Sequence, residues 1–485
     1  MCLPGFHVAE PDDVTYQDQK GADIIEEEMN VESVLNFLPE HMNWMQHLAV
    51  CVWIAVVVTA GCQSLRAGRY PGHGPAVVST AQGMVAGITE KSLNGRSFWS
   101  YYGIPYAKPP VGQLRLRDPL PAEPWDGLRN ATVVPQPCLQ VEFHTAFAEM
   151  RLTPQQVVGT EDCLYLNVFT PTVASPQPLP VMVYIPGGAF FAGGTHEYQP
   201  HVLLNHDIVL VVLQYRVGIL GFLSTEDSVI PGNLGLKDQT MALHWVQNNI
   251  YNFGGDPNCV TIIGQSAGGA AVHFQILTPK SRGLFSRAII QSGVALAPFA
   301  LGNRHREIAE RVGGSLGCDT RYGSTHLLAC LQTLDAHELT ATIQDFFEWS
   351  FLPLPLGPRV DGDFLPAHPA LLLRDRQYNP VDILSGTTAH EGLIIAYPLF
   401  SQRNLHESLM KNFSYAGPRS LICCDGSYDP LSVTRRIYTY YLGGVNFNLE
   451  TQKDQIIQVL KNKKISQVNS VTECFLRHRG NRRKI

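Results

Sequence analysis

One serine in this sequence has the neighbours that a nucleophile requires. Residues 264–268 read Gly-Gln-Ser-Ala-Gly, so Ser266 stands between two glycines, each two positions away. A serine hydroxyl is well placed to attack an ester when it is exposed on a sharp turn between a strand and a helix, and flanking glycines remove the Cβ atoms that would collide there. The β-branched residues 260–263 fit the strand, and residues 267–275 fit the helix. The pattern predicts a catalytic serine; a glycine-rich turn with an incidental serine is the alternative.

A second stretch supplies the hydrogen-bond donors that acyl transfer also needs. Residues 186–194 read Pro-Gly-Gly-Ala-Phe-Phe-Ala-Gly-Gly and follow an apolar run at 181–185. Attack on an ester creates a negatively charged oxygen that backbone N–H groups stabilise, and small residues let the substrate approach them closely. We expect the N–H groups of Gly188, Ala189 and Ala267 to form this oxyanion hole. Taken alone, the loop fits an ordinary turn equally well.

The elements that must position these residues alternate along the chain from about residue 160 onward. Alternation of apolar strand-like runs with helical patterns is typical of a mostly parallel sheet covered by helices on both faces. Before it, residues 76–90 predict a strand-turn-strand unit, and residues 96–107 predict a second, aromatic-rich strand pair. We therefore predict an α/β fold with antiparallel strands at its start. The strand candidates are 164–169, 181–185, 208–215, 260–263, 287–292 and 381–386, and the helix candidates are 237–249 and 305–314.

Composition describes one enzyme-sized globular unit. The 485 residues are 45% hydrophobic and 16% charged, with a net charge of −6. This balance gives no electrostatic reason to expect a nucleic acid as partner. The sequence contains neither paired CxxC motifs nor a Walker-type phosphate loop. We therefore expect no metal and no cofactor.

The first sixty residues are expected to lie outside that unit. Residues 1–46 are acidic and lack apolar periodicity, which predicts a disordered extension. Residues 47–62 contain thirteen uncharged residues at 48–60, which is short for a membrane span and typical of the apolar part of a signal peptide. A short signal anchor and a buried helix are the alternatives. The segment predicts secretion, or attachment to a membrane facing outward if it is an anchor.

Cysteines and glycosylation sequons also favour an oxidising compartment. Among the eleven cysteines, two pairs are spaced so that a disulfide would close a loop in a turn-rich segment. Each disulfide would stabilise the protein by about 3 kcal/mol. Sequons for N-glycosylation begin at Asn130 and Asn412. The alternative is a cytosolic protein in which every thiol is free. The two candidate pairs are Cys138 with Cys163 and Cys318 with Cys330.

Longer motifs extend over most of the chain in a fixed order. They are GIPYAKPPVGQLRLRDP (103–119), WDG (125–127), EDCLYLNVF (161–169), IPGGAF (185–190), YRVGILGFLS (215–224), PGNLGLKDQ (231–239), FGGDPNCVTIIGQSAGG (253–269) and VDGDFLP (360–366). On these motifs, residues from about Val77 to about Gly444 resemble the type-B carboxylesterase and cholinesterase family of α/β-hydrolases, with the bile-salt-activated lipases as a similar branch. The resemblance implies an α/β-hydrolase fold, hydrolysis of carboxylic esters without a cofactor, and disulfides in the same two loops.

The resemblance also assigns the acid of a catalytic triad. The family carries a Glu or Asp in a Gly-x-x-x-x-acid-Gly stretch after a late strand, and residues 386–392 match this pattern with Glu391. Glu391 would orient a histidine and stabilise its positive charge. By residue type alone, a glutamate after a strand is usually a solvated surface charge.

The histidine of such a triad is the main departure from the family. It follows the acid in the chain, but after Glu391 only His406 and His478 occur, and neither has the His-Gly setting of the family. We therefore expect the hydrolase domain to span 76–460 without the family's C-terminal part. Residues 461–485, with eight basic residues and one acid, are expected to be a basic tail unlike the family. Loss of the base lowers turnover by about a million-fold, which corresponds to a loss of about 8 kcal/mol in transition-state stabilisation.

Three hypotheses follow. The first is a hydrolase of small-molecule or lipid carboxylic esters, impaired by the missing histidine. The second is an inactive binding or adhesion protein on the same fold, as in the neuroligin-like branch. The third is an incomplete gene product.

Two smaller departures from the family bear on the substrate and on the loop. Thr153 stands near the place where cholinesterases carry a choline-binding tryptophan, which argues against choline selectivity. Pro186 replaces the Tyr or His that usually precedes the glycine pair.

Overall fold

The computed structural model describes residues 76–141, 156–173, 177–349, 352, 354, 356–421 and 429–460. All of them belong to the second of two compact units of the chain, Val57–Ile485. Several expectations fall outside the described residues: the acidic extension at 1–46, the apolar segment at 47–62, the basic tail at 461–485, Thr153 and His478.

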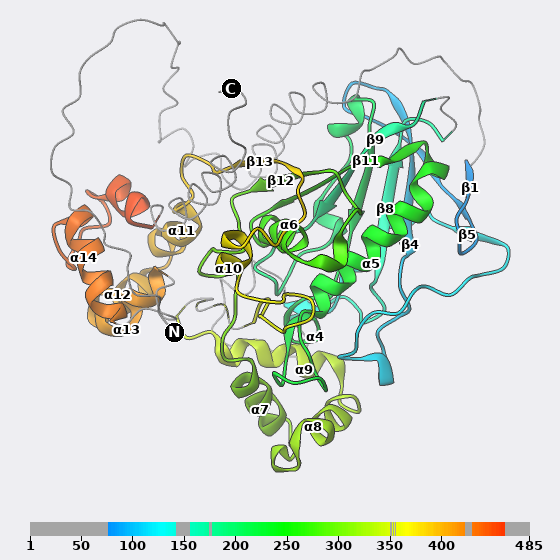
Figure 1. The fold of residues 1–485 in the computed structure, drawn as a ribbon. Coiled ribbons are helices and arrows are strands. Elements are labelled where there is room, and N and C mark those ends of the chain that lie inside the picture. The colour runs from blue at the N-terminus through cyan, green and yellow to red at the C-terminus, as the bar shows by residue number, and fades with distance from the viewer. Residues whose placement is uncertain are drawn as a thin grey trace, which may run out of the picture. The chain divides into compact units, whose positions relative to one another are not determined.

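The central element is an eight-stranded sheet with the strand order β13-β12-β11-β9-β10-β8-β4-β3 (Figure 1). Strands β13, β12, β11, β9 and β10 run parallel, and β8, β4 and β3 continue the sheet in antiparallel fashion. The expected α/β architecture with antiparallel strands at the start is therefore confirmed. The strands are β3 (Ile88–Lys91), β4 (Ser97–Pro105), β8 (Tyr165–Thr170), β9 (Leu179–Ile185), β10 (Val209–Leu213), β11 (Gly255–Gln265), β12 (Arg287–Gln291) and β13 (Asp382–Gly386).

Apolar side chains on both faces explain why the central strands occupy the middle of this sheet. All five residues of β10 are buried, as are the last five residues of β9. Strands covered on both faces need continuous apolar runs instead of an alternating pattern. Two smaller sheets flank the large one: β1 (Val77–Ser79), β2 (Met84–Ala86) and β5 (Leu128–Asn130) form one, and β6 (Gln140–Val141) and β7 (Val157–Val158) form the other.

One expectation about the strands is wrong. Residues 96–107 do not form a strand pair but a single strand, β4, which pairs with β3 on one side and with β8 on the other. Gly103, within this strand, has φ of 65° and its N–H donates to Asn167 Oδ1 at 2.9 Å. The pairing register with β8 shifts between Tyr101 and Ile104. The glycine therefore makes a local irregularity within one strand, as a bulge does, and does not reverse the chain.

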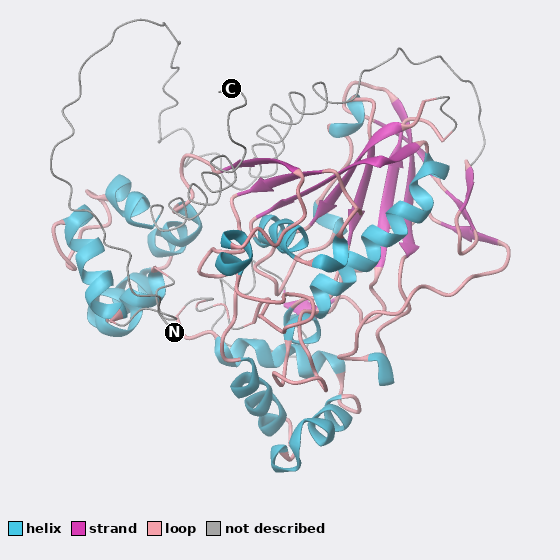
Figure 2. Ribbon diagram, viewed as in Figure 1, coloured by secondary structure: helices cyan, strands magenta, loops and turns pink. Residues whose placement is uncertain are grey.

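Helices lie beside the sheet and in two further groups (Figure 2). Helix α6 contacts β11, β12 and β9, and α5 contacts β11. Helices α11 to α14 enclose a core of their own, to which Leu409, Phe413 and Tyr438 contribute. The helices are α4 (Gly218–Phe222), α5 (Leu234–Asn249), α6 (Ala267–Leu277), α7 (His305–Ser315), α8 (Gly323–Leu331), α9 (Ala336–Ala341), α10 (Pro369–Arg374), α11 (Leu393–Ser401), α12 (Arg403–Lys411), α13 (Phe413–Ser420) and α14 (Pro430–Leu442).

Both cysteine pairs expected from the sequence are disulfides. Cys138 is bonded to Cys163, and Cys318 is bonded to Cys330. Within the described part of the chain, no helix combines the length and the apolar character needed to cross a bilayer.

Candidate active site

Ser266 forms the turn between a strand and a helix, as the sequence predicts. Strand β11 ends at Gln265 and helix α6 begins at Ala267, and Ser266 between them has φ of 57° and ψ of −123°. A non-glycine residue in this region stores about 1–3 kcal/mol of strain, so the surroundings must hold it there. The N–H of Ser266 donates to the carbonyl of Gln291 on β12 at 2.8 Å. The residue itself is only half-buried.

The glycines around this turn are required by close backbone contacts. A Cβ on Gly264 would lie 2.3 Å from the carbonyl oxygen of Gly268, and a Cβ on Gly293 would lie 1.9 Å from that of Ser266. A Cβ on Gly187 would lie 2.5 Å from the carbonyl oxygen of Gln265 and 3.5 Å from Cβ of Ser266. The loop after β9 therefore lies directly against the serine turn. Residues far apart in the sequence meet at one point.

The loop after β9 leaves two of its backbone N–H groups without an acceptor among the described residues. Gly188, Ala189 and Phe190 have φ of 111°, 54° and 63°, and the carbonyl of Gly188 accepts the N–H groups of Phe191 and Ala192, both at 3.0 Å. No described residue accepts a hydrogen bond from the N–H of Gly188 or Ala189. Ala267, as the first residue of α6, has an N–H that the helix leaves without an acceptor. These are the three donors that the sequence predicts for an oxyanion hole.

Two tyrosines, Tyr215 buried and Tyr198 half-buried, support the start of this loop. The Tyr215 hydroxyl donates to the carbonyl of Pro186 at 2.7 Å, and the N–H of Gly187 donates to the Tyr198 hydroxyl at 3.4 Å. Burial raises the pKa of Tyr198 to about 12 and raises that of Tyr215 further. Both hydroxyls therefore remain neutral hydrogen-bonding groups near pH 7. Proline at position 186 removes one donor but leaves its carbonyl engaged.

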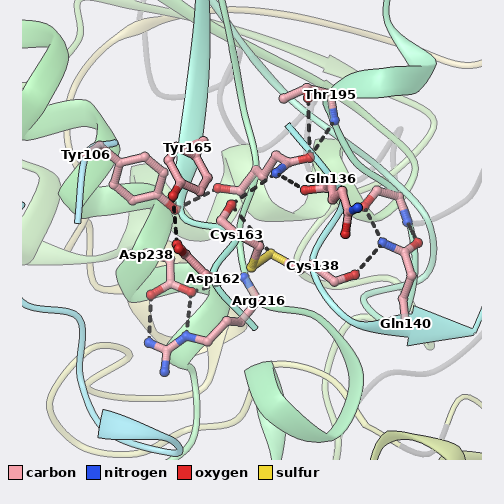
Figure 3. Close-up of a disulfide and its surroundings, with 12 residues drawn as sticks. Tyr106, Gln136, Cys138, Gln140, Asp162, Cys163, Tyr165, Thr195, Arg216 and Asp238 are labelled. Atoms are coloured by element: carbon pink, nitrogen blue, oxygen red, sulfur yellow. Dashed lines mark hydrogen bonds and ion pairs between the residues drawn. A yellow bond between two sulfur atoms is a disulfide. The ribbon is translucent and has the colours of Figure 1, made fainter. Parts of the chain in front are cut away.

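A buried ion pair fixes the segment that carries Tyr215. The guanidinium of Arg216 donates to both carboxylate oxygens of Asp238 on α5, at 2.7 and 2.8 Å, and Figure 3 shows the pair. The backbone N–H of Arg216 also donates to Asp238. Both side chains are almost fully buried, so removal of either charge would leave the other uncompensated. The pair holds the backbone next to Tyr215 in place.

Glu391 is held by three donor groups, from two residues that the sequence pattern did not single out, Ser292 and Thr388. Its Oε1 accepts the Ser292 hydroxyl at 2.5 Å, the Thr388 N–H at 2.8 Å and the Thr388 hydroxyl at 3.0 Å. No described residue donates to its other oxygen. Ser292 follows β12 directly and has φ of 54°. The Gln-Ser-Gly triplet at the end of an apolar run was the signal that could have drawn attention to it.

The described histidines do not complete a triad with Ser266 and Glu391. His406 lies on α12, and its ring packs against Phe447 of the core that α11 to α14 enclose, with 5.9 Å between the ring centroids. Burial lowers its pKa. His273 on α6 is fully buried; its Nδ1 accepts the N–H of Ala295 at 3.1 Å, and burial lowers its pKa to about 4. The structure thus brings Ser266 and the loop donors together, and leaves His406 apart from them.

The remaining predicted site residues lie on the surface or away from this site. Asn130 ends β5 and Asn412 separates α12 from α13, and both are exposed. Among the described residues, no group of three or more His, Cys, Asp or Glu side chains is arranged to hold a metal ion.

Comparison with known proteins gives a single family. A profile described as "Carboxylesterase family" matches residues 74–479, a range that runs past residue 460 into the segment expected to be unlike the family. Esterase FE4 of Myzus persicae is 40% identical over 340 residues, which is 68% of this chain and 58% of the esterase. Venom carboxylesterase-6 of Apis mellifera is 37% identical over 401 residues, covering 80% of this chain and 70% of the relative.

A third relative is the juvenile hormone esterase of Tribolium castaneum. It is 38% identical over 382 residues, which is 76% of this chain and 64% of that enzyme. The chain therefore spans between 58% and 70% of the length of these three relatives.

Proposed function

The chain belongs to the carboxylesterase family, and from this premise we propose that it hydrolyses carboxylic esters through an acyl-enzyme on Ser266. The observation that carries the proposal is the contact between the serine turn and the loop after β9, where Gly187 lies against Ser266. The two N–H groups that follow Gly187 have no acceptor among the described residues. A free pair of donors beside a strained serine is the arrangement that acyl transfer requires.

The proposed reaction begins with attack by the serine. A bond forms between Ser266 Oγ and the carbonyl carbon, the carbonyl π electrons move to the oxygen, and a general base takes the hydroxyl proton. The N–H groups of Gly188, Ala189 and Ala267 hold the resulting oxyanion. The bond to the alkoxy oxygen then breaks, and the alcohol leaves with that proton. Water repeats the sequence on the acyl-enzyme and releases the acid. The route requires no cofactor.

Glu391 is proposed to orient the base. Its Oε1 is fully engaged by Ser292 and Thr388, so the other oxygen is the one that would accept an imidazole N–H. His273 and His406 are not proposed as the base, because the first is fully buried and the second packs in the core of α11 to α14.

The setting of this chemistry is proposed to be extracellular. Two of the relatives are named a venom carboxylesterase and a juvenile hormone esterase, and the two disulfides fit an oxidising compartment. We propose glycans at Asn130 and Asn412, a signal segment at 47–62, and a hydrolase domain of 76–460. The substrates are small-molecule or lipid esters.

A burst experiment tests the hydrolase. Full-length protein mixed with a para-nitrophenyl ester should release a burst of para-nitrophenol equal to the enzyme concentration, and Ser266→Ala should abolish it. Ser401→Ala is the control, because the hydroxyl of this exposed serine on α11 bonds, among the described residues, only to backbone carbonyls. Mass spectrometry after an organophosphonate should find the adduct on the peptide that contains Ser266. Absence of both burst and adduct would favour the inactive adhesion protein.

A further inference from the structure

A single buried amide holds the far end of the loop that carries Gly188 and Ala189. Gln140 on β6 is 3% exposed. Its Oε1 accepts the N–H of Gly193 at 2.6 Å, and its Nε2 donates to the carbonyl of Gly193 at 3.1 Å. Nε2 also donates to the carbonyl of Cys138 at 2.9 Å, and Figure 3 shows these bonds. One side chain thus bonds both backbone groups of one glycine.

Fixing Gly193 also fixes the glycines of the proposed oxyanion hole. The loop folds back on itself so closely that a Cβ on Gly193 would lie 2.2 Å from the carbonyl oxygen of Gly187. A Cβ on Gly188 would lie 2.1 Å from the carbonyl oxygen of Ala192. A shift of Gly193 would therefore displace Gly187 and Gly188 with it. The direction of the Gly188 N–H depends on this stacking.

The Cys138–Cys163 disulfide lies beside Gln140 and connects it to a second amide. Gln214 Nε2 donates to the carbonyl of Cys163 at 3.0 Å, and Gln214 Oε1 accepts the N–H of Thr195 at 3.4 Å. Thr195 directly follows the loop, so the amides of Gln140 and Gln214 bond to nearby positions of one backbone segment. The segment that carries Gln140 also pairs with Val158 on β7.

We infer that Gln140 is a positioning residue for the oxyanion hole, which it fixes through Gly193 from a segment held by the Cys138–Cys163 disulfide. The inference rests on the proposed function, because it concerns the donors of the same reaction. Gln140 touches no reacting atom. It acts by keeping the N–H groups of Gly188 and Ala189 aimed at the position of the oxyanion, where a displacement of about 1 Å costs about 100-fold in rate.

Gln140→Met tests this role, because methionine keeps the length of the side chain and removes its hydrogen bonds. Amide hydrogen exchange in residues 186–194 should become faster, and kcat on a para-nitrophenyl ester should fall about 10- to 100-fold with little change in KM. The affinity for a trifluoromethyl ketone, which forms the oxyanion on Ser266, should fall by the same factor as kcat/KM.

Gln247→Met is the matched control. Gln247 on α5 is half-buried and its amide also makes two bonds to backbone carbonyls, those of Pro257 and Leu284. Its loss should lower stability but leave the exchange of 186–194 and kcat unchanged. Unchanged exchange and unchanged kcat in Gln140→Met would overturn the inference. If the unaltered protein hydrolyses no ester, the proposed function fails, and hydrogen exchange alone still decides whether Gln140 positions the loop.

Gln140→Glu covers the case in which the methionine variant does not fold. A neutral carboxylic acid can accept the Gly193 N–H and donate one of the two hydrogen bonds that the amide donates, whereas a carboxylate can only accept. Relative to the unaltered protein at each pH, kcat and the protection of 186–194 should recover as the pH falls and the new carboxyl takes up a proton. If the ratio of kcat between Gln140→Glu and the unaltered protein does not change with pH, the inference is contradicted.

Discussion

The hydroxyl of Ser292 lies 2.5 Å from Oε1 of Glu391 and donates a hydrogen bond to it. Ser292 also donates its N–H to the carbonyl of Gly386 at 2.9 Å, which joins the ends of β12 and β13. Its chain neighbour Gln291 accepts the N–H of Ser266. Two consecutive residues therefore connect the turn at Ser266 to Glu391.

Ser292→Ala should lower kcat/KM for a para-nitrophenyl ester by about tenfold, which corresponds to about 1.4 kcal/mol. The reason is that Glu391 loses one of its three donors and is oriented less firmly. Ser286→Ala is the control, since the half-buried hydroxyl of Ser286 bonds only to the backbone of Val260. Equal activity in both variants would show that the Ser292 hydroxyl has no part in orienting the acid.

Gly293→Ala should destabilise the protein by about 3 kcal/mol or more, because its Cβ would meet the Ser266 carbonyl at 1.9 Å and backbone would have to move. Gly386→Ala, at the end of β13, has no atom within 4 Å of its added Cβ and should cost far less. Urea denaturation of the two variants measures the difference. Equal midpoints would mean that the serine turn relaxes without penalty.

Stability should fall as the pH drops from about 6.5 toward 4. Burial lowers the pKa of His273 from 6.5 to about 4, so the folded protein keeps this imidazole neutral while the unfolded chain protonates first. Neutral His273 therefore contributes about 3 kcal/mol to the free energy of unfolding above pH 6.5, and this contribution is lost as the pH falls toward 4. The free energy of unfolding in urea across this range should depend less on pH in His273→Gln. In His326→Gln, which replaces an exposed histidine on α8, the pH dependence should match that of the unaltered protein.

A glycan at Asn130 should protect an apolar surface on the β1–β2–β5 sheet. Cross-strand pairing places Asn130 on the same face as Val77, Met84 and Leu128, whose side chains are 48%, 45% and 54% exposed. Protein from a secretory host should carry a glycan there, and Asn130→Gln should increase self-association in light scattering. Asn412→Gln removes the other sequon as a control. An unglycosylated Asn130, or no change in association, would contradict this prediction.

The sequence predicted those features that depend on neighbouring residues. The turn at Ser266 follows from its flanking glycines, and the free donors of Gly188 and Ala189 follow from the glycine-rich loop after an apolar strand. Gln140 and Ser292 were not predictable in this way, because their partners Gly193 and Glu391 lie 53 and 99 residues away. The tertiary fold brings them together. The strand β4 was predicted as two strands for a related reason: its continuity is decided by β8, which pairs with it on both sides of Gly103.

The close packing of glycines around Ser266 limits how this fold can be redesigned. Because a Cβ on Gly187 would meet the backbone of the serine turn, and a Cβ on Gly293 would meet the carbonyl of Ser266, the turn and its loop must be transplanted together to keep their geometry. Mutational libraries aimed at new ester preferences should therefore leave these positions constant and diversify the surrounding side chains. A graft that replaces only the serine turn or only the loop after β9 is expected to disrupt folding in most cases.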